Sequence, residues 1–510
     1  MKKILNIAIC GLLGAMAFTS CSEDKLDISP TSSVSGTTVM ANATAALVPL
    51  NGIYRSMYTA GWSTTGNTHQ CFGISAYNLM AEVMGDDLIM GASGSGWFWF
   101  DALYNVKARY TSGAWRPYDL WHAYFAWVSN ANAIIAAENT MQGLQSEVNY
   151  VIGQAYAIRA YSYFMLAQTF ARTYAGHESE PCVPIYTEAT QAGMSGNPRS
   201  TVAQVYERIN TDIDKAIELL NGTTRQHKSH IDYSVALGLK ARIALVQENW
   251  EAAKEAAHAA ITASKAEILA VKEFIGLNDV SKANVMWGAE VITDQRGQYA
   301  SLFAHMDTVL TYGKTAPKLI SRSLYNKMSS TDTRLAWWNL NSPLTDVAVH
   351  QCKMTFSDPT TWLGDYIWMR VEEMYLIAAE AECRLGDETA AKTDLMALMS
   401  VRDPNYSVDS KTGTSLGTLT SSYTGSLLDE IIIQRRLELW GEAGRIYDIR
   451  RLRQGFRRSA SDGWPDAALL ETRPTDNPES YMWVMTIPQA EFDGNSSLNQ
   501  QTDQNPVGDL

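Results

Sequence analysis

The chain has 510 residues, and 46% of them are hydrophobic, which is enough to bury a large core and too many for a disordered protein. Its 54 acidic and 41 basic residues give a net charge of -13, which argues against nucleic-acid binding because phosphate contacts need a basic surface. The 15 Trp and 24 Tyr residues suit ring stacking at interfaces as well as packing in the core.

Residues 1–20 have the features of a secretory leader. Lys2 and Lys3 form a charged start, an apolar run covers 4–18, and a small residue, Ser20, precedes Cys21. This end resembles a bacterial lipoprotein box, so we expect Cys21 to be lipidated; the alternative is a plain cleaved leader. Because no later segment has about 18 uninterrupted apolar residues, we expect only this lipid to anchor the protein.

Residues 21–44 are rich in Ser and Thr and suit a tether, and helical patterns begin at residue 45. Apolar residues recur at steps of three and four in 45–58, 115–139, 148–170 and 205–220. Ser200 is the expected N-cap of the last of these helices. These patterns predict a mainly α-helical protein.

Two stretches of the sequence, 239–257 and 377–395, repeat each other. Leu239, Ala241, Ala253, Lys254 and Ala257 align at one constant separation with Ile377, Ala379, Ala391, Lys392 and Leu395. Each stretch predicts a helix, a tight turn and a second helix, and its small residues allow close helix packing, as in tetratricopeptide repeats. The alternative is two unrelated Ala-rich hairpins. We expect a helical scaffold over about 45–265 and 366–455.

Three segments interrupt this scaffold, at about 60–115, 276–365 and 403–425. They lack the helical period and carry Gly, Pro, Ser and Thr, a composition of loops and short strands. Two of them hold the candidate ligand-binding residues, which are Trp97, Trp99, Tyr299, Trp287, Trp337, Trp338 and Trp362. In an extended chain Trp97 and Trp99 would share one side and Phe98 and Phe100 the other, so that one pair anchors and the other faces solvent. The alternative for each Trp is burial in the core.

The stretch 427–453 predicts one long helix with an apolar side and a side of alternating charges. Leu428, Ile432, Leu439, Ile446 and Ile449 mark the apolar side, and Arg435, Glu438, Glu442, Arg445 and Asp448 mark the other. We expect these charges to fix packing and helix ends rather than to perform chemistry.

This stretch resembles a signature block of the RagB/SusD family of outer-membrane nutrient-binding lipoproteins, with Gln434 and Ala443 as departures. The run from Arg159 to Tyr174 followed by Val183-Pro184-Ile185, and the closing Ile487-Pro488 and Gln504-Asn505-Pro506, resemble other elements of that family. The resemblance implies an all-α body, 45–510, built on tetratricopeptide-like helix pairs. It also implies capture of an oligosaccharide at the cell surface and its delivery to a TonB-dependent, SusC-like transporter, without catalysis.

Three other functions stay open from the sequence. The same architecture can capture peptides or another nutrient, or serve as a structural scaffold. A glycosidase or peptidase is the third, because adjacent carboxylates occur as Asp86–Asp87 and Glu372–Glu373, although phosphate-binding, zinc-protease and serine-hydrolase motifs are missing. No cofactor is expected, and a calcium ion among the acidic loops stays open. Cys71, Cys182, Cys352 and Cys383 match neither a zinc nor a redox motif, so we expect buried free thiols, although three pairings remain formally open.

Overall fold

The computed structural model of the chain describes residues 39–61, 67–91, 97–105, 109–191, 193–339, 349–442 and 444–507. The expected leader, Cys21 and most of the tether lie outside the described residues, as do residues 92–96 of the Gly/Ser run and Ala443. In the part that is described, no helix is long and apolar enough to cross a membrane.

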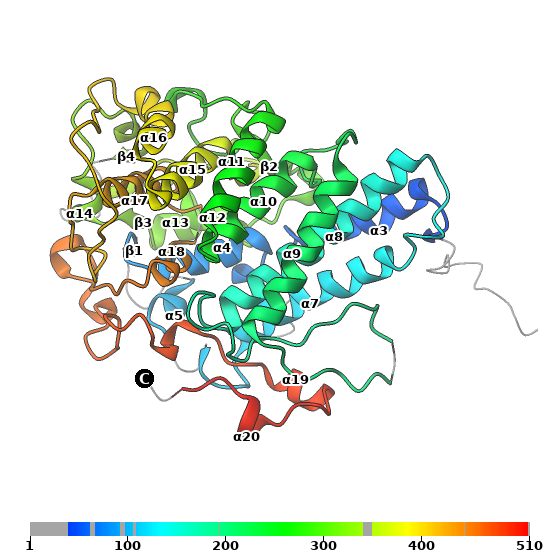
Figure 1. The fold of residues 1–510 in the computed structure, drawn as a ribbon. Coiled ribbons are helices and arrows are strands. Elements are labelled where there is room, and N and C mark those ends of the chain that lie inside the picture. The colour runs from blue at the N-terminus through cyan, green and yellow to red at the C-terminus, as the bar shows by residue number, and fades with distance from the viewer. Residues whose placement is uncertain are drawn as a thin grey trace, which may run out of the picture.

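Long helices pack side by side in chain order and confirm the expected mainly α-helical fold (Figure 1). Each helix contacts the next along the chain, and α15 follows α11 in the row although a long insertion separates them in sequence. The row consists of α7 (Trp115–Ile135), α8 (Gln145–Phe170), α9 (Val202–Leu220), α10 (Tyr233–Val246), α11 (Trp250–Ser264), α15 (Val371–Leu385) and α16 (Glu388–Arg402), with α3 (Ala43–Ser56) against α7 and α8.

The two repeated stretches form matching hairpins, α10–α11 and α15–α16, which confirms the predicted repeat. The turn residues Glu248 and Gly386 both have left-handed backbones, with φ of 56° and 87°. The following residues, Asn249 and Asp387, both cap the second helix with a side-chain oxygen. The hairpins therefore agree in their turns as well as in their small residues.

Helix α9 begins one residue later than the sequence suggested. Thr201, not Ser200, is the N-cap. Its hydroxyl oxygen accepts from the backbone N–H of Gln204 at 3.2 Å, and its own backbone N–H donates to the Gln204 side chain at 2.9 Å. Ser200 instead pairs its backbone with Cys182 and Val183, at 2.7 and 3.1 Å. This bridge keeps Ser200 in the preceding extended segment.

Two paired strands flank the long insertion after α11 where it joins the helical scaffold. Strand β2 (Val285–Ala289) pairs antiparallel with β6 (Tyr366–Arg370), which leads directly into α15. A second, antiparallel sheet in the order β1-β3-β5-β4 fastens the insertion to the early chain through β1 (Leu88–Met90). Its other strands are β3 (Lys318–Ile320), β4 (Trp338–Asn339) and β5 (Val349–Gln351), and the insertion's short α-helices are α12 (Leu302–Met306), α13 (Thr311–Thr315) and α14 (Arg322–Tyr325). The predicted mixture of loops and short strands is confirmed, with short helices added.

The single helix predicted over 427–453 is wrong. Helix α17 (Leu427–Glu438) ends before Gly441, and α18 (Arg445–Arg451) begins after Gly444. Both glycines have left-handed backbones, with φ of 81° and 77°, which an α-helix does not contain. The chain therefore turns between the two helices.

The charges of this stretch point into the molecule. Arg436 and Arg445 both contact Asp87, at 2.6 and 2.8 Å, and Arg445 lies 3.0 Å from Asp86. These acids follow α4 (Ile74–Val83), which packs against α18. The charged side of the stretch therefore stabilises the core, as expected, and several of its charges do so through partners that are distant in sequence.

The remaining short helices and the cysteines complete the described chain. The helices are α5 (Trp99–Ala102), α19 (Gln489–Gly494) and α20 (Gln500–Asp503), with short 3-10 turns at Thr68–Gln70, Val271–Glu273, Thr293–Gln295, Thr333–Trp337, Ala460–Asp462, Asp466–Ala468 and Tyr481–Trp483. The four cysteines of the described chain are free, and all except Cys352 are buried.

Candidate ligand-binding site

Three of the predicted residues, Trp97, Tyr299 and Trp362, meet in one cluster. Tyr299 and Trp362 pack with their ring centroids 5.1 Å apart. Trp97 joins them through His69 and Tyr312, whose ring centroids lie 5.4 and 5.7 Å from its own. Tyr299 lies 5.7 Å from the rings of both His69 and Tyr312. We call these five residues the aromatic site.

The rings of the aromatic site are open to solvent in part. Tyr299 has an exposed fraction of 43%, and the other four residues are half-buried. An exposed ring face is an apolar surface with a fixed orientation, and it suits the C–H face of a sugar or a flat side chain. The site can therefore bind a ligand by stacking without bond making or breaking.

A buried layer holds the site from below. His305 stacks on Tyr312 at 5.2 Å and meets Phe98 edge-on at 5.0 Å. Its Nε2 donates a hydrogen bond to the backbone oxygen of His69, 2.7 Å away. Burial lowers the pKa of His305 well below its usual value, so this imidazole is neutral and packs as an aromatic ring. The surface rings thus rest on a buried layer that connects the early chain to the insertion.

A tight turn orients Trp362. Asp358 accepts hydrogen bonds from the backbone and hydroxyl of Thr360, at 2.9 and 2.6 Å, and from the hydroxyl of Thr361, at 2.6 Å. These bonds lower the pKa of the Asp358 carboxyl to about 2. Trp362 follows with a φ of 61°, which is rare for a bulky residue, and packs edge-on against Phe356. The contacts around it hold this unfavourable backbone in place.

Polar groups lie beside the rings. Arg296 is exposed and donates a hydrogen bond to the backbone oxygen of Thr361, 3.3 Å away, next to Trp362. Gln298 is exposed directly before Tyr299. A guanidinium and an amide supply donors and an acceptor for ligand hydroxyl groups. The surface therefore combines apolar faces with hydrogen-bonding groups.

The other four predicted residues, Trp99, Trp287, Trp337 and Trp338, belong to the core. Trp287 and Trp337 have no exposed surface, and Trp99 and Trp338 have less than a tenth. Trp287 donates from Nε1 to the backbone oxygen of Ser229 at 2.9 Å, and Trp338 packs edge-on against Trp440 at 4.9 Å. A buried ring offers no face to a ligand, so we leave these four residues out of the candidate site.

The expected alternation of 97–100 is also wrong. Phe98 has a left-handed backbone, with φ of 74°, and α5 begins at Trp99. The turn buries Phe98 and Trp99 and leaves Phe100 more than half exposed. Trp97 alone of this aromatic run therefore joins the aromatic site.

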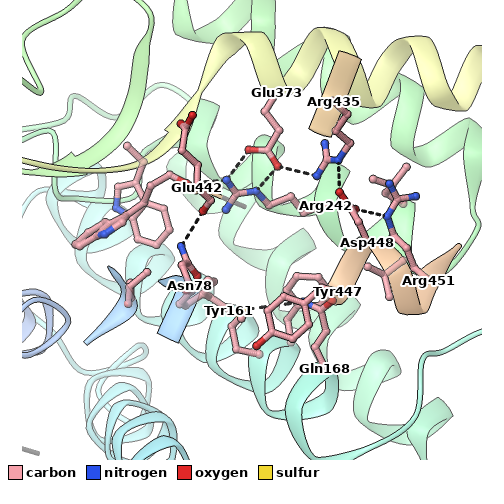
Figure 2. A pocket seen from close by; sticks show the side chains of 17 residues that line it. Asn78, Tyr161, Gln168, Arg242, Glu373, Arg435, Glu442, Tyr447, Asp448 and Arg451 are labelled. Atoms are coloured by element: carbon pink, nitrogen blue, oxygen red, sulfur yellow. Dashed lines mark hydrogen bonds and ion pairs between the residues drawn. The ribbon is translucent and has the colours of Figure 1, made fainter. Parts of the chain in front are cut away.

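A small cavity inside the scaffold is lined by charges from several helices (Figure 2). Arg435 and Arg451 each lie 2.7 Å from Asp448, and Arg242 lies 2.5 Å from Glu373. The cavity measures about 60 Å³. This volume accommodates a few water molecules, whereas ligand pockets usually measure roughly 300–1,000 Å³. We assign these charges to stability.

The adjacent carboxylates are engaged in buried ion pairs. Asp86 and Asp87 contact Arg436 and Arg445, as described above. Glu372 lies 3.1 Å from Arg402, and Glu373 pairs with Arg242. Acids held between arginines in the core are not placed to cleave a bound ligand.

Sequence reasoning missed His69 and Tyr312 as members of the site. Tyr312 lies in the predicted aromatic insertion but had no feature to distinguish it from buried neighbours. His69 stands alone in sequence, and its role arises from Tyr312, whose hydroxyl lies 2.7 Å from His69 Nδ1. Only the fold brings these two segments together.

Two family models match the chain. Residues 80–245 match a model described as starch-binding associating with outer membrane, and residues 294–506 match the model of the SusD family. No curated protein matches the chain significantly.

Several solved structures have a similar fold. One is a SusD-like carbohydrate binding protein from Bacteroides vulgatus, with 24% identity, a TM-score of 0.75, and coverage of 92% of this chain and 99% of that chain. A SusD superfamily protein from Bacteroides thetaiotaomicron has 21% identity, a TM-score of 0.71, and coverage of 91% and 100%. Surface glycan-binding protein A from the same organism has 16% identity, a TM-score of 0.68, and coverage of 92% and 100%.

Proposed function

Since this chain belongs to the RagB/SusD family, we propose that it binds a glycan at the aromatic site as part of nutrient uptake at the outer membrane. The description of the first matching family model names starch binding and association with the outer membrane. Two similar folds belong to proteins named for carbohydrate and glycan binding. These names support the ligand class for this chain.

The observation that carries the proposal is the meeting of Trp97, Tyr299 and Trp362 around His69 and Tyr312. The three rings come from separate segments of the chain and remain partly exposed, although large aromatic residues favour burial. Sugar rings have apolar C–H faces bordered by hydroxyl groups. The partly exposed rings match the first feature, and the exposed Arg296 and Gln298 side chains match the second.

The wider role follows from the family. We place the protein on the cell surface, anchored by lipid on Cys21 and docked on a SusC-like, TonB-dependent transporter that receives the glycan. Labelling with a radioactive fatty acid should modify the wild-type chain and not a Cys21→Ala variant. Co-purification of the lipidated chain with its transporter tests the partner.

Substitution of the aromatic site tests the glycan proposal. We expect Trp97→Ala, Tyr299→Ala and Trp362→Ala each to lower oligosaccharide affinity about tenfold or more, because each removes a stacking surface. A glycan array identifies a ligand for the wild-type chain, and calorimetry then measures the dissociation constant of each variant.

Trp250→Ala is the matched control, because Trp250 is a half-buried Trp at the start of scaffold helix α11. This variant should bind the glycan as the wild-type chain does. Binding of peptides in place of every oligosaccharide on the array would support the other nutrient class and contradict the proposal. Release of shortened glycan by the purified chain would contradict a purely binding role.

A further inference from the structure

Three side chains from three helices meet between the two repeated hairpins. His258 lies on α11, Glu382 on α15 and Asp394 on α16. His258 Nε2 is 2.7 Å from an Asp394 oxygen and 3.5 Å from Glu382 Oε1. One ligand atom from each residue lies within 4.8 Å of the other two. The three helices therefore present one imidazole and two carboxylates to a common point.

Glu382 is the buried member of this cluster, and one of its two carboxylate oxygens, Oε1, lies near His258. Glu382 has an exposed fraction of 3%, and its buried Oε2 accepts no hydrogen bond from an N–H or hydroxyl group of the described residues. A buried carboxylate oxygen normally finds a partner, because losing its water without replacement is costly. The His258 side chain is 44% exposed, so the cluster is open to solvent on one side. A buried carboxylate oxygen that accepts no N–H or hydroxyl bond, beside a partly exposed imidazole, is an arrangement that a bound cation would satisfy.

We propose that His258, Glu382 and Asp394 bind a divalent cation of the zinc class. Zinc binds His nitrogen and Asp or Glu oxygen, and a site with three protein ligands is completed by water in the fourth position. The imidazole argues against calcium and magnesium, which prefer oxygen ligands throughout. The exposed edge beside His258 is the place for the water ligand.

The site joins the two repeats at one interface only. At the constant separation of the repeat, the positions that match Glu382, Asp394 and His258 carry Ala244, Ala256 and Met396. Those residues cannot form a second site of this kind. The cation would connect α11 to the α15–α16 hairpin across the point where the long insertion interrupts the scaffold. No sequence motif reveals it, because each ligand lies on a different helix.

Zinc titration of the full chain tests this proposal. We expect the chelator-treated protein, carrying no histidine tag, to bind one zinc ion at this site by calorimetry. Saturating zinc should also raise the midpoint of thermal unfolding by about 3 °C, because a ligand of the folded state stabilises it. Cobalt in place of zinc should give the strong visible absorption of a four-coordinate site.

Two variants and one control decide the outcome. His258→Ala and Asp394→Asn should each weaken zinc binding at least about tenfold and abolish the cobalt spectrum. His227→Ala, at an exposed histidine outside the cluster, should leave both unchanged. Circular dichroism without metal shows whether each variant is folded. Absence of zinc binding by the wild-type chain, or undiminished binding by folded His258→Ala, would overturn the proposal and leave the cluster a simple ion pair.

Discussion

Glu82 is a carboxyl group buried where α4 meets the turn before α18. Its Oε1 accepts hydrogen bonds from the backbone of Gly444 and Arg445, at 2.7 and 3.1 Å. Burial outweighs these bonds and raises the pKa of Glu82 to about 7. The group therefore binds its proton more tightly in the folded chain than in the unfolded chain.

This difference predicts a loss of stability as the pH rises. Below about pH 4.5 the carboxyl is protonated in both states, and its contribution to stability is fully present. Between about pH 4.5 and 7 the unfolded chain releases the proton first, so the free energy of unfolding falls by about 3 kcal/mol. Glu82→Gln keeps an oxygen for the two backbone donors and does not titrate.

Urea unfolding at pH 5 and pH 8 measures this effect. The wild-type chain should lose about 2.5 kcal/mol more than Glu82→Gln between the two values, because at pH 5 the unfolded carboxyl has already begun to release its proton. Glu207→Gln, at an exposed position of α9, should behave as the wild-type chain does. Equal losses in wild type and Glu82→Gln would show that the carboxyl does not hold its proton.

The sequence showed which residues carry charge, but it did not show with which residues these charges form salt bridges. The charges of 427–453 suggested salt bridges along one helix, yet Glu438 lies 2.9 Å from Arg402 and 3.1 Å from Arg370. Likewise, Arg436 reaches Asp87 near the other end of the chain. Periodicity predicts which residues share a helix face, and it contains no information about which distant element will cover that face.

At the level of elements, the break between α17 and α18 depends on glycine. A Cβ on Gly444 would lie 2.7 Å from the Tyr447 ring and 3.2 Å from the Ala81 side chain. The same Cβ on Gly386, in the turn between α15 and α16, would meet nothing within 4 Å, and both glycines have left-handed backbones. An alanine at Gly386 would therefore cause backbone strain alone, whereas an alanine at Gly444 would cause the same strain and a steric conflict.

We expect Gly386→Ala to lower the free energy of unfolding by about 1 kcal/mol, from strain alone. Gly444→Ala should cost about 2 to 3 kcal/mol, because the tight contact adds to the strain. Denaturant unfolding of both variants gives the comparison. Equal costs would mean that Tyr447 moves aside freely.

The sequence predicted the helices and hairpins better than any other part of the structure. Apolar residues recur at helical steps along the long helices, most clearly in α9, and the turns of the repeated hairpins carry the capping residues Asn249 and Asp387. The break at Gly441 and Gly444 was missed because the charge pattern continues across it, although two nearby glycines are a common signal for a helix end. The turn at Phe98 gave no such signal, since phenylalanine rarely adopts a left-handed backbone.

In the whole molecule, the aromatic site joins the early chain to the insertion. His69 and Trp97 come from the first, and Tyr299, Tyr312 and Trp362 from the second. The scaffold helices position both segments without contributing a ring to the site. A ligand that stacks on these rings must therefore contact two segments that are far apart in sequence.

We expect a bound oligosaccharide to slow amide hydrogen exchange in both segments together, around residues 67–71 and 296–315. A ligand that contacts both should suppress their local opening, whereas α9 should exchange at the same rate with and without it. Mass spectrometry of the exchanged chain measures this. Protection confined to one segment would mean that the ligand binds only part of the aromatic site.

The paired strands β2 and β6 have a consequence for the chain between them. Because the two strands hold the ends of 290–365 next to each other, the entropy of closing this loop depends only weakly on its length. Doubling the length of a flexible loop costs about 0.6 kcal/mol, which is small beside the stability of a folded domain. Residues can therefore be added to exposed turns between these strands at little thermodynamic cost to the scaffold, so new binding surfaces can arise by changes in length as well as by substitution.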